Sequence, residues 1–338
     1  MSAALAPLRA LGGWWFAPAP AERLAALRIV VGAFAFFYLT TRIGLFLGYA
    51  RFPARDFVPL GVTRLLDAPL ASSAYIAILF VTIVLAALFT TGTLYRITAP
   101  LFAIALLFLI TYRNSWSMPF HTENLLVLHV VALAISRAAD AWSVDSHRSR
   151  RPHPANPARP HHDTAVIPPS ESRAPAASRV SDAYGWPIRL MAALTALTYV
   201  LAGIAKLRLG GMAWAEGEFL RDQVAVDNLR KVLLGADASP FATPLLEHAW
   251  LFEVMAIATL LVELGAPLAL AGGRIAAIWA VAAWGFHVGV VLLMTIVFPY
   301  PLIGIAYAPL FPVDRVITWL VARARRLQAR RVQARARS

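Results

Sequence analysis

Residues 74–95, with the sequence AYIAILFVTIVLAALFTTGTLY, contain no charged side chain. An α-helix needs about 20 predominantly apolar residues to cross the hydrocarbon core of a bilayer. This stretch has that length, and the next apolar segment, 97–112, begins directly after Arg96. The sequence therefore predicts two neighbouring transmembrane helices joined by a short polar turn.

The same pattern recurs along most of the chain. Six further apolar segments are candidate spans: 24–48, 123–136 with a start near Pro119, 187–206, 250–271, 275–295 and 299–312. The last of them is short and is interrupted by Pro301 and Pro309. We therefore expect an all-α fold, a polytopic membrane helix bundle with about eight transmembrane helices. Residues 1–315 are predicted to form this transmembrane domain.

The composition agrees with lipid as the main solvent. Of the 338 residues, 59% are hydrophobic and 14% are charged, whereas soluble domains carry about 25% charged residues. The formal net charge of +13 favours an anionic membrane surface over nucleic acid as a partner, because the arginines cluster beside apolar spans. The chain has no cysteine, which excludes disulfides and thiolate metal sites, and no metal site is predicted.

Two basic segments accompany the spans. Segment 143–183 is rich in Pro, Ser, Ala and Arg and cannot bury a core, so it predicts a disordered linker within the membrane domain. Residues 316–338 predict a basic tail that lies on the inner leaflet. Each arginine near anionic lipid adds about 1 kcal/mol of attraction, so anionic lipid is the expected partner of this tail.

The distribution of arginine predicts the orientation. With eight spans, the N-terminus, the linker and the tail fall on one side of the membrane, and basic residues near span ends favour the cytoplasmic side. We therefore expect a multi-pass protein of a bacterial cell (inner) membrane with cytoplasmic N- and C-termini. Three loops, 49–73, 113–121 and 208–249, are predicted on the outer side, and the first of these is the exception because it also carries arginines.

Lys206 is one of two lysines in a chain that otherwise uses arginine, and it ends the predicted span 187–206. A lysine that reaches the lipid headgroups from a span end is a sufficient structural explanation. A desolvated lysine, however, binds its proton less tightly and becomes a usable base at neutral pH. A headgroup contact would be served equally well by arginine, so we favour Lys206 as a candidate catalytic base.

Polar residues also gather at the start of span 123–136. His121 and Asn124 are candidate substrate-binding residues, together with Asn114 from the preceding loop. Glu123 is a candidate supporting residue, although a carboxylate at a helix start is also stabilised by the helix dipole. A substrate-binding role and a purely structural role at the helix start explain this cluster equally well.

His287 lies within span 275–295 among apolar residues. A buried imidazole needs a hydrogen-bond partner, and Glu253 and Glu263 of the preceding span are the candidate partners. A purely structural histidine remains the alternative. A haem held by His129 and His287 is a further alternative.

Several motifs together resemble a known family. The segment 199–207, YVLAGIAKL, is followed by Trp214 and Gly217; Ser115-Trp116 precedes His121; the segment 142–145 is WSVD; and Phe286-His287 precedes the segment 298–300, FPY. In this order, over residues 20–315, they resemble the membrane region of vitamin K-dependent γ-glutamyl carboxylases and their bacterial relatives, the horizontally transferred transmembrane (HTTM) domain proteins.

The resemblance implies an enzymatic activity. Such carboxylases oxidise reduced vitamin K to its epoxide with O2, after a lysine has deprotonated the quinol, and then carboxylate a glutamate with CO2. By this resemblance Lys206 is the catalytic lysine, while His287, His121, Trp214 and Asn124 would bind the quinone. Reduced vitamin K or menaquinol would be the cofactor, with a lyase activity that couples quinol epoxidation to carboxylation.

Two features depart from the family pattern. Ala205 stands where the motif tends to have a second lysine. The sequence after residue 312 is an arginine-rich tail rather than a large lumenal domain, so capture of a propeptide by such a domain is not expected, and the protein substrate is unknown. A non-catalytic membrane binding or transport protein of the same fold is the alternative, in which Lys206 stays charged and pairs with an acid such as Glu216 or Asp222.

Overall fold

The computed structural model describes residues 6–116, 119–149 and 179–335. These residues form helices almost throughout, and the two strands are only two residues long, β1 (Ala19–Pro20) and β2 (Val180–Ser181). The strands pair antiparallel, with Ala19 opposite Ser181. The expected all-α bundle is confirmed.

The first half of the described chain folds into adjacent helices. After α1 (Ala6–Trp15), helix α2 packs against α4, α4 against α5, and α5 against α6. Their bounds are α2 Ala21–Thr41, α3 Ile43–Gly48, η2 Tyr49–Arg51, η3 Ala54–Asp56, η4 Gly61–Leu65, α4 Ser72–Thr91, α5 Tyr95–Asn114, α6 Asn124–Ala134 and α7 Val144–Ser149.

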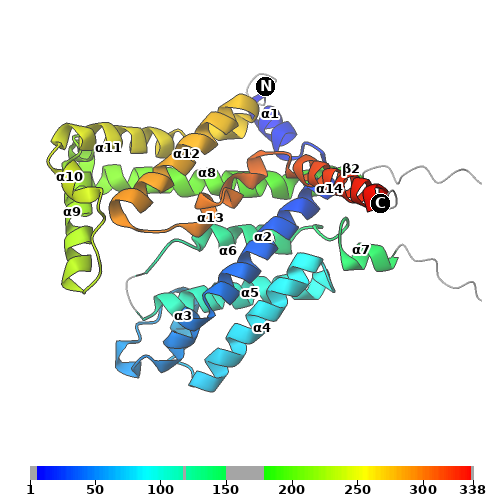
Figure 1. Ribbon diagram of the computed structural model, residues 1–338, viewed down its shortest axis with the longest axis horizontal. Coiled ribbons are helices and arrows are strands. Elements are labelled where there is room, and N and C mark those ends of the chain that lie inside the picture. Colours follow the sequence, from blue (N-terminus) through cyan, green and yellow to red (C-terminus); the bar gives the residue numbers. More distant parts are fainter. Residues whose placement is uncertain (1–5, 117–118, 150–178, 336–338) are drawn as a thin grey trace, which may run out of the picture.

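The second half begins with the longest helix, α8 (Asp182–Gly210), which packs against α6, α11 and η6. Helix α8 therefore joins the two halves of the bundle (Figure 1). The remaining elements are η5 Gly211–Trp214, α9 Glu218–Leu233, α10 Ala242–Leu246, α11 Ala249–Leu264, η6 Ala266–Ala271, α12 Gly273–Met294, α13 Pro299–Leu302, η7 Ile305–Leu310 and α14 Val313–Arg335.

Five helices in the described residues are long and apolar enough to cross a membrane: Ala21–Thr41, Ser72–Thr91, Tyr95–Asn114, Asp182–Trp214 and Gly273–Met294. The predicted number of about eight is therefore not confirmed. Three of the predicted spans are shorter as helices, for physical reasons. Helix α6 has 11 residues, α11 gives way to the 3-10 turn η6, and Pro301, Gly304 and Pro309 break the last segment into α13 and η7.

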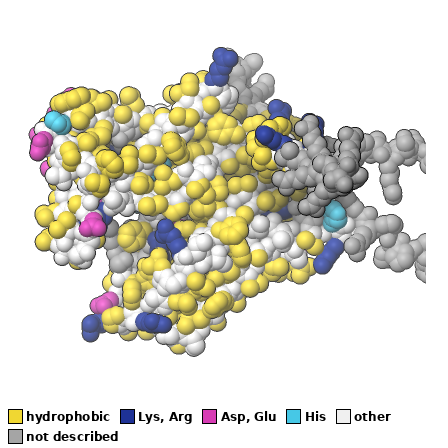
Figure 2. All heavy atoms as spheres, viewed as in Figure 1, with side chains coloured by type: hydrophobic (Ala, Val, Ile, Leu, Met, Phe, Trp, Pro, Cys, Tyr) yellow, Lys and Arg dark blue, Asp and Glu magenta, His cyan; other side chains and the backbone are white. Residues whose placement is uncertain are grey.

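The outer surface of the spans is apolar. Ile104, Leu261 and Ile278 are 65–72% exposed, and hydrophobic side chains cover most of the face in Figure 2. A water-soluble monomer rarely exposes so large an apolar area. The surface and the span lengths together make this an integral membrane protein.

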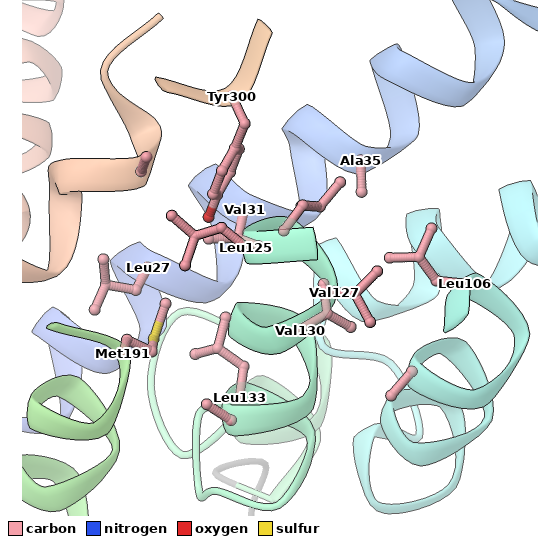
Figure 3. Close-up of a cluster of buried hydrophobic side chains, with 14 of the residues drawn as sticks. Leu27, Val31, Ala35, Leu106, Leu125, Val127, Val130, Leu133, Met191 and Tyr300 are labelled. Atoms are coloured by element: carbon pink, nitrogen blue, oxygen red, sulfur yellow. The ribbon is translucent and has the colours of Figure 1, made fainter. Parts of the chain in front are cut away.

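The core lies where α2, α5, α6, α8 and α13 meet (Figure 3). Leu27, Val31, Leu133 and Met191 are fully buried there, and Tyr300 closes the cluster from α13. Burying one such aliphatic side chain contributes about 1.5–3 kcal/mol in a protein that folds from water. Within a bilayer, van der Waals packing supplies most of the corresponding stabilisation.

A buried arginine fastens the first span to the end of α6. Arg28 is 0% exposed and donates hydrogen bonds to the backbone carbonyls of Ala138, Ala141 and Trp142, at 2.8, 3.4 and 2.5 Å. These carbonyls lie in the turns that follow α6, which ends at Ala134. Arg28 therefore has a structural role inside the bundle.

The chain termini and α7 lie at one end of the bundle, while α3, α9 and α10 lie at the other (Figure 1). The predicted disorder of segment 143–183 is wrong at both of its ends, because α7, β2 and the start of α8 are ordered there. Asp145 explains α7, since its carboxylate accepts from the backbone N–H groups of Leu94 and Tyr95 at 2.9 and 2.8 Å. Residues 150–178 of the predicted linker lie outside the described residues. The described part of the predicted basic tail belongs to α14.

Candidate functional site

A cavity of about 280 Å³ lies between α6, α8, α9, α11 and α12, towards the end of the bundle opposite the termini. Five of the predicted site residues line it: His121, Lys206, Trp214, Glu263 and His287. Lys206 and Trp214 lie eight residues apart, and the other three come from distant segments of the chain, so the fold assembles the site.

Lys206 forms an ion pair with Glu263 of α11. The lysine side chain is 20% exposed and the glutamate side chain 2%, so water reaches the pair only from the lysine side. The Lys206 ammonium also lies 5.4 Å from the ring centroid of Trp214 and 5.6 Å from that of Phe286, within the range of a cation–π interaction. Lys206 thus points into the cavity, and neither Glu216 nor Asp222 is its partner.

Gly203 allows the two helices of this ion pair to approach each other. A Cβ atom on Gly203 would lie 2.9 Å from Leu264 Cδ2 and 3.1 Å from Glu263 Cβ. A side chain at this position would push α11 away from α8, because such distances are shorter than ordinary van der Waals contact. The glycine one turn before Lys206 therefore brings Glu263 within reach of the lysine.

His287 is paired with a tyrosine rather than with a predicted glutamate. Its Nε2 atom lies 2.8 Å from the hydroxyl of Tyr199, which in turn lies 2.9 Å from the hydroxyl of Tyr307. Glu253, the other predicted partner, is exposed near the start of α11 and does not line the cavity. The expected pairing of His287 with Glu253 or Glu263 is therefore wrong.

Three buried polar atoms of cavity residues have no hydrogen-bond partner among the described residues. They are Oε2 of Glu263, Nε1 of Trp214 and Nδ1 of His287. Buried polar groups in native proteins are nearly always satisfied by protein, water or a ligand. Together they offer a strong acceptor, a donor and an imidazole nitrogen that can play either part, a set that matches a small molecule bearing hydroxyl or carbonyl groups.

His121 stands at the rim of the cavity, before α6. Its ring and that of His287 both contact Phe298, with centroids 5.3 and 5.0 Å apart respectively. His121 remains exposed, yet the surrounding protein removes enough water to lower the pKa of its imidazole; Glu123 opposes this change and the Lys206 ammonium adds to it. His121 is therefore neutral at pH 7 and available as an acceptor.

Glu123 and Asn124 do not line the cavity. Glu123 is buried and forms a bidentate ion pair with Arg113, at 2.9 Å for both contacts, and also accepts from Tyr38 and Thr122. These four donors occupy its carboxylate, so its role is to fix the turn that carries His121. Asn124 is exposed at the first position of α6. Asn114, by contrast, is buried and bonds the backbone of Phe120 on the same turn.

His129 is fully buried and fully bonded. Its Nδ1 atom lies 2.7 Å from the Tyr300 hydroxyl, and its Nε2 atom lies 3.1 Å from the Met191 carbonyl and 3.2 Å from the Thr195 hydroxyl. Neither nitrogen is free to ligate iron, which contradicts a haem held by His129 and His287. The structural explanation of a buried histidine applies to His129.

Two site residues were not predicted as such. Tyr199 and Tyr307 connect His287 to the interior, and Tyr199 also lines the cavity. Tyr199 opens the motif YVLAGIAKL, where a hydroxyl seven residues before Lys206 lies on the same face of a helix. That spacing was the available signal, whereas nothing in the local sequence connects Tyr307 to His287.

Comparison with known proteins supports the membrane assignment. Residues 16–167 match the profile of the HTTM domain, which is just under half of the chain. No curated protein and no solved structure matches the chain significantly. The profile match includes His121 and ends before Lys206, Trp214, Glu263 and His287. The protein is thus an integral membrane protein in which residues 16–167 are similar to the HTTM domain.

Proposed function

We propose that the cavity binds a lipid-soluble quinol and that Lys206 removes a proton from it. The observation that carries the proposal is the set of three unpartnered polar atoms, Glu263 Oε2, Trp214 Nε1 and His287 Nδ1, beside a partly buried lysine. A quinol presents two hydroxyl groups on a flat aromatic ring. Its hydroxyls can pair with these atoms, and its ring can pack against Phe286 and Phe298.

A second cavity supports a ligand with an apolar tail. It has a volume of about 340 Å³, lies between α9, α11 and α12, and is lined almost entirely by apolar side chains. The two cavities share five lining residues, so they adjoin: Leu220, Thr259, Phe286, Val290 and Met294. An isoprenoid tail in the apolar cavity would leave the quinol head beside Lys206.

The ion pair allows Lys206 to act as a base in a proton-balanced way. Transfer of the ammonium proton to Glu263 gives a neutral amine beside a carboxylic acid. An apolar ligand that displaces water from the cavity favours this neutral pair, because a desolvated ion pair is costly. The Lys206 amine then takes the quinol proton and becomes an ammonium, which stabilises the quinolate.

The resemblance to vitamin K-dependent carboxylases supplies the rest of the proposal. Reduced vitamin K or menaquinol would be oxidised to its epoxide, O2 would be the oxidant, and CO2 would be added to a carbanion on a protein glutamate. The proposal includes a bacterial inner membrane, with the termini and the Arg-rich tail on the cytoplasmic side and the tail in contact with anionic lipid.

A non-catalytic binding or transport protein is the second candidate, and the Lys206–Glu263 ion pair favours it. A lysine that stays charged beside a buried carboxylate holds a ligand by its charge and hydrogen bonds without taking a proton. This candidate uses the same cavity, and it differs only in predicting no turnover.

The test measures quinol binding and epoxide formation in the same samples. Menaquinol quenching of the tryptophan fluorescence reports binding, since Trp214 lines the cavity. We compare wild type with Lys206→Met/Glu263→Gln, which leaves no unpaired charge, and with Arg208→Met, which removes an exposed charge two residues further along α8. We expect epoxide from wild type and Arg208→Met and none from the double variant. Binding without epoxide in all samples supports the non-catalytic candidate, and absence of binding refutes both.

A further inference from the structure

A third cavity, of about 270 Å³, lies at the end of the bundle that carries the termini. It is lined by the first turn of α5, by the turn that follows α6, by helix α7 and by the residue before β2. Three arginines line this arginine cavity, Arg96, Arg137 and Arg179, together with Asp140 and Asp145. It shares no residue with the quinol site.

Both carboxylates of the arginine cavity are already bonded within the protein. Asp145 accepts from the backbone N–H groups of Leu94 and Tyr95, at 2.9 and 2.8 Å. Asp140 accepts from the Tyr184 hydroxyl at 2.9 Å and from Arg137 at 3.0 Å. The carboxylate oxygens of Asp145 and Asp140 therefore already bind the α5 N-terminus, Tyr184 and Arg137.

Arg96 and Arg179 have no hydrogen bond or ion pair from their guanidinium groups to any described residue. Both side chains are exposed and line the same cavity. Two free guanidinium groups on a shared cavity fit a phosphate, which arginine binds through paired, charge-assisted hydrogen bonds.

An apolar surface continues from this cavity along the bundle. Ile97, Leu101 and Ile104 recur on one face of α5 and are 63, 49 and 65% exposed, and Ile135, the residue after α6, is 63% exposed. Ile97 follows Arg96 directly, and Ile135 precedes the lining residue Ser136. A headgroup at the arginines would therefore place its acyl chains against this face.

From these observations we propose that the arginine cavity binds the phosphate headgroup of an anionic phospholipid whose acyl chains lie along α5 and α6. The cavity charge, three arginines against two satisfied aspartates, favours a headgroup with a net negative charge. The adjoining apolar face favours a membrane lipid over inorganic phosphate. This site is separate from the arginine-rich tail, because none of its described lining residues belongs to α14.

The test uses a local reporter, since the chain has no native cysteine. Leu94→Cys, at an exposed position two residues before Arg96, carries an environment-sensitive dye on delipidated protein in detergent. Phosphatidylglycerol, phosphatidylcholine and inorganic phosphate are titrated separately. The test variant is Arg96→Gln/Arg179→Gln, and the matched control is Arg51→Gln/Arg64→Gln, which removes two exposed arginines from the loop at the opposite end. Melting temperatures confirm that each variant folds.

We expect the dye to report phosphatidylglycerol binding in wild type and in the control variant. The half-saturation concentration should rise roughly 30-fold in Arg96→Gln/Arg179→Gln, because two guanidinium contacts are lost. Equal phosphatidylglycerol binding by the two double variants overturns the proposal. An equal response to inorganic phosphate or to phosphatidylcholine overturns the assignment to an anionic lipid.

Discussion

Removing Lys206 alone should destabilise the protein more than removing Lys206 together with Glu263. Lys206→Met leaves the Glu263 carboxylate 2% exposed without its cation, and breaking a buried pair in this way costs about 3–5 kcal/mol. We expect a loss of about 3 kcal/mol, because Glu263 can relieve part of the cost by taking up a proton. Glu263→Gln should cost less, since the lysine is 20% exposed and still reaches water.

The double variant Lys206→Met/Glu263→Gln removes both charges and should recover most of this loss. Contacting residues show coupling energies of about 0.5–3 kcal/mol in double-mutant cycles, and a pair this buried should lie in the upper half of that range. Thermal unfolding of the four proteins in one detergent, followed by intrinsic fluorescence, gives the cycle. Strictly additive losses would refute the ion pair as a stabilising contact, and Lys206→Ala could then serve as a simple activity control.

Three further predictions concern the surroundings of the site. Gly203→Val should lower stability by about 1–3 kcal/mol through overpacking against α11. Gly285 has open space around it, so Gly285→Ala should change the melting temperature little. Equal effects of the two variants would contradict the close approach at Gly203. Glu123→Gln should cost about 3 kcal/mol, because Arg113 is left as a buried cation, and a loss below 1 kcal/mol in the same unfolding assay would show that the pair is not buried. The pKa of His121 is lowered in the folded protein, so the unfolded state binds its proton first and stability falls as the pH drops through about 6.5. The variant His121→Gln should therefore lose less stability than wild type between pH 7 and 5. An identical pH dependence of unfolding in the two proteins would exclude the effect.

The sequence predicted the class of fold well because lipid imposes a simple rule on it. Helix α4 is long and contains no charged residue, so its apolar length alone identifies it. Helices α6 and α11 are shorter than a span, and prolines break the segment that contains α13. Whether such segments complete a crossing depends on tertiary packing, which hydropathy does not report.

The candidate site was predictable in its residue types and not in its pairing. Lys206, Glu263 and His287 stood out because charged and polar groups are rare at these depths. Their partners depend on which helices adjoin, so Glu263 was assigned to His287 although it pairs with Lys206. Glu123 carried the same signal as Glu263, yet Arg113 neutralises it. Arg113 lies ten residues earlier, at the end of a different helix, and its side-chain direction is a property of the fold.

The contacts of Arg28 set an order of events during synthesis. This arginine lies in the first long helix, but its three backbone acceptors belong to residues 138–142. At about 5–20 residues per second, those acceptors are made roughly 5–20 s after Arg28. The pairing of Ala19 with Ser181 waits longer still. Helix α2 therefore cannot reach its final position when it leaves the ribosome. A ribosome stalled before residue 138 should leave the Arg28 position accessible to water-soluble reagents.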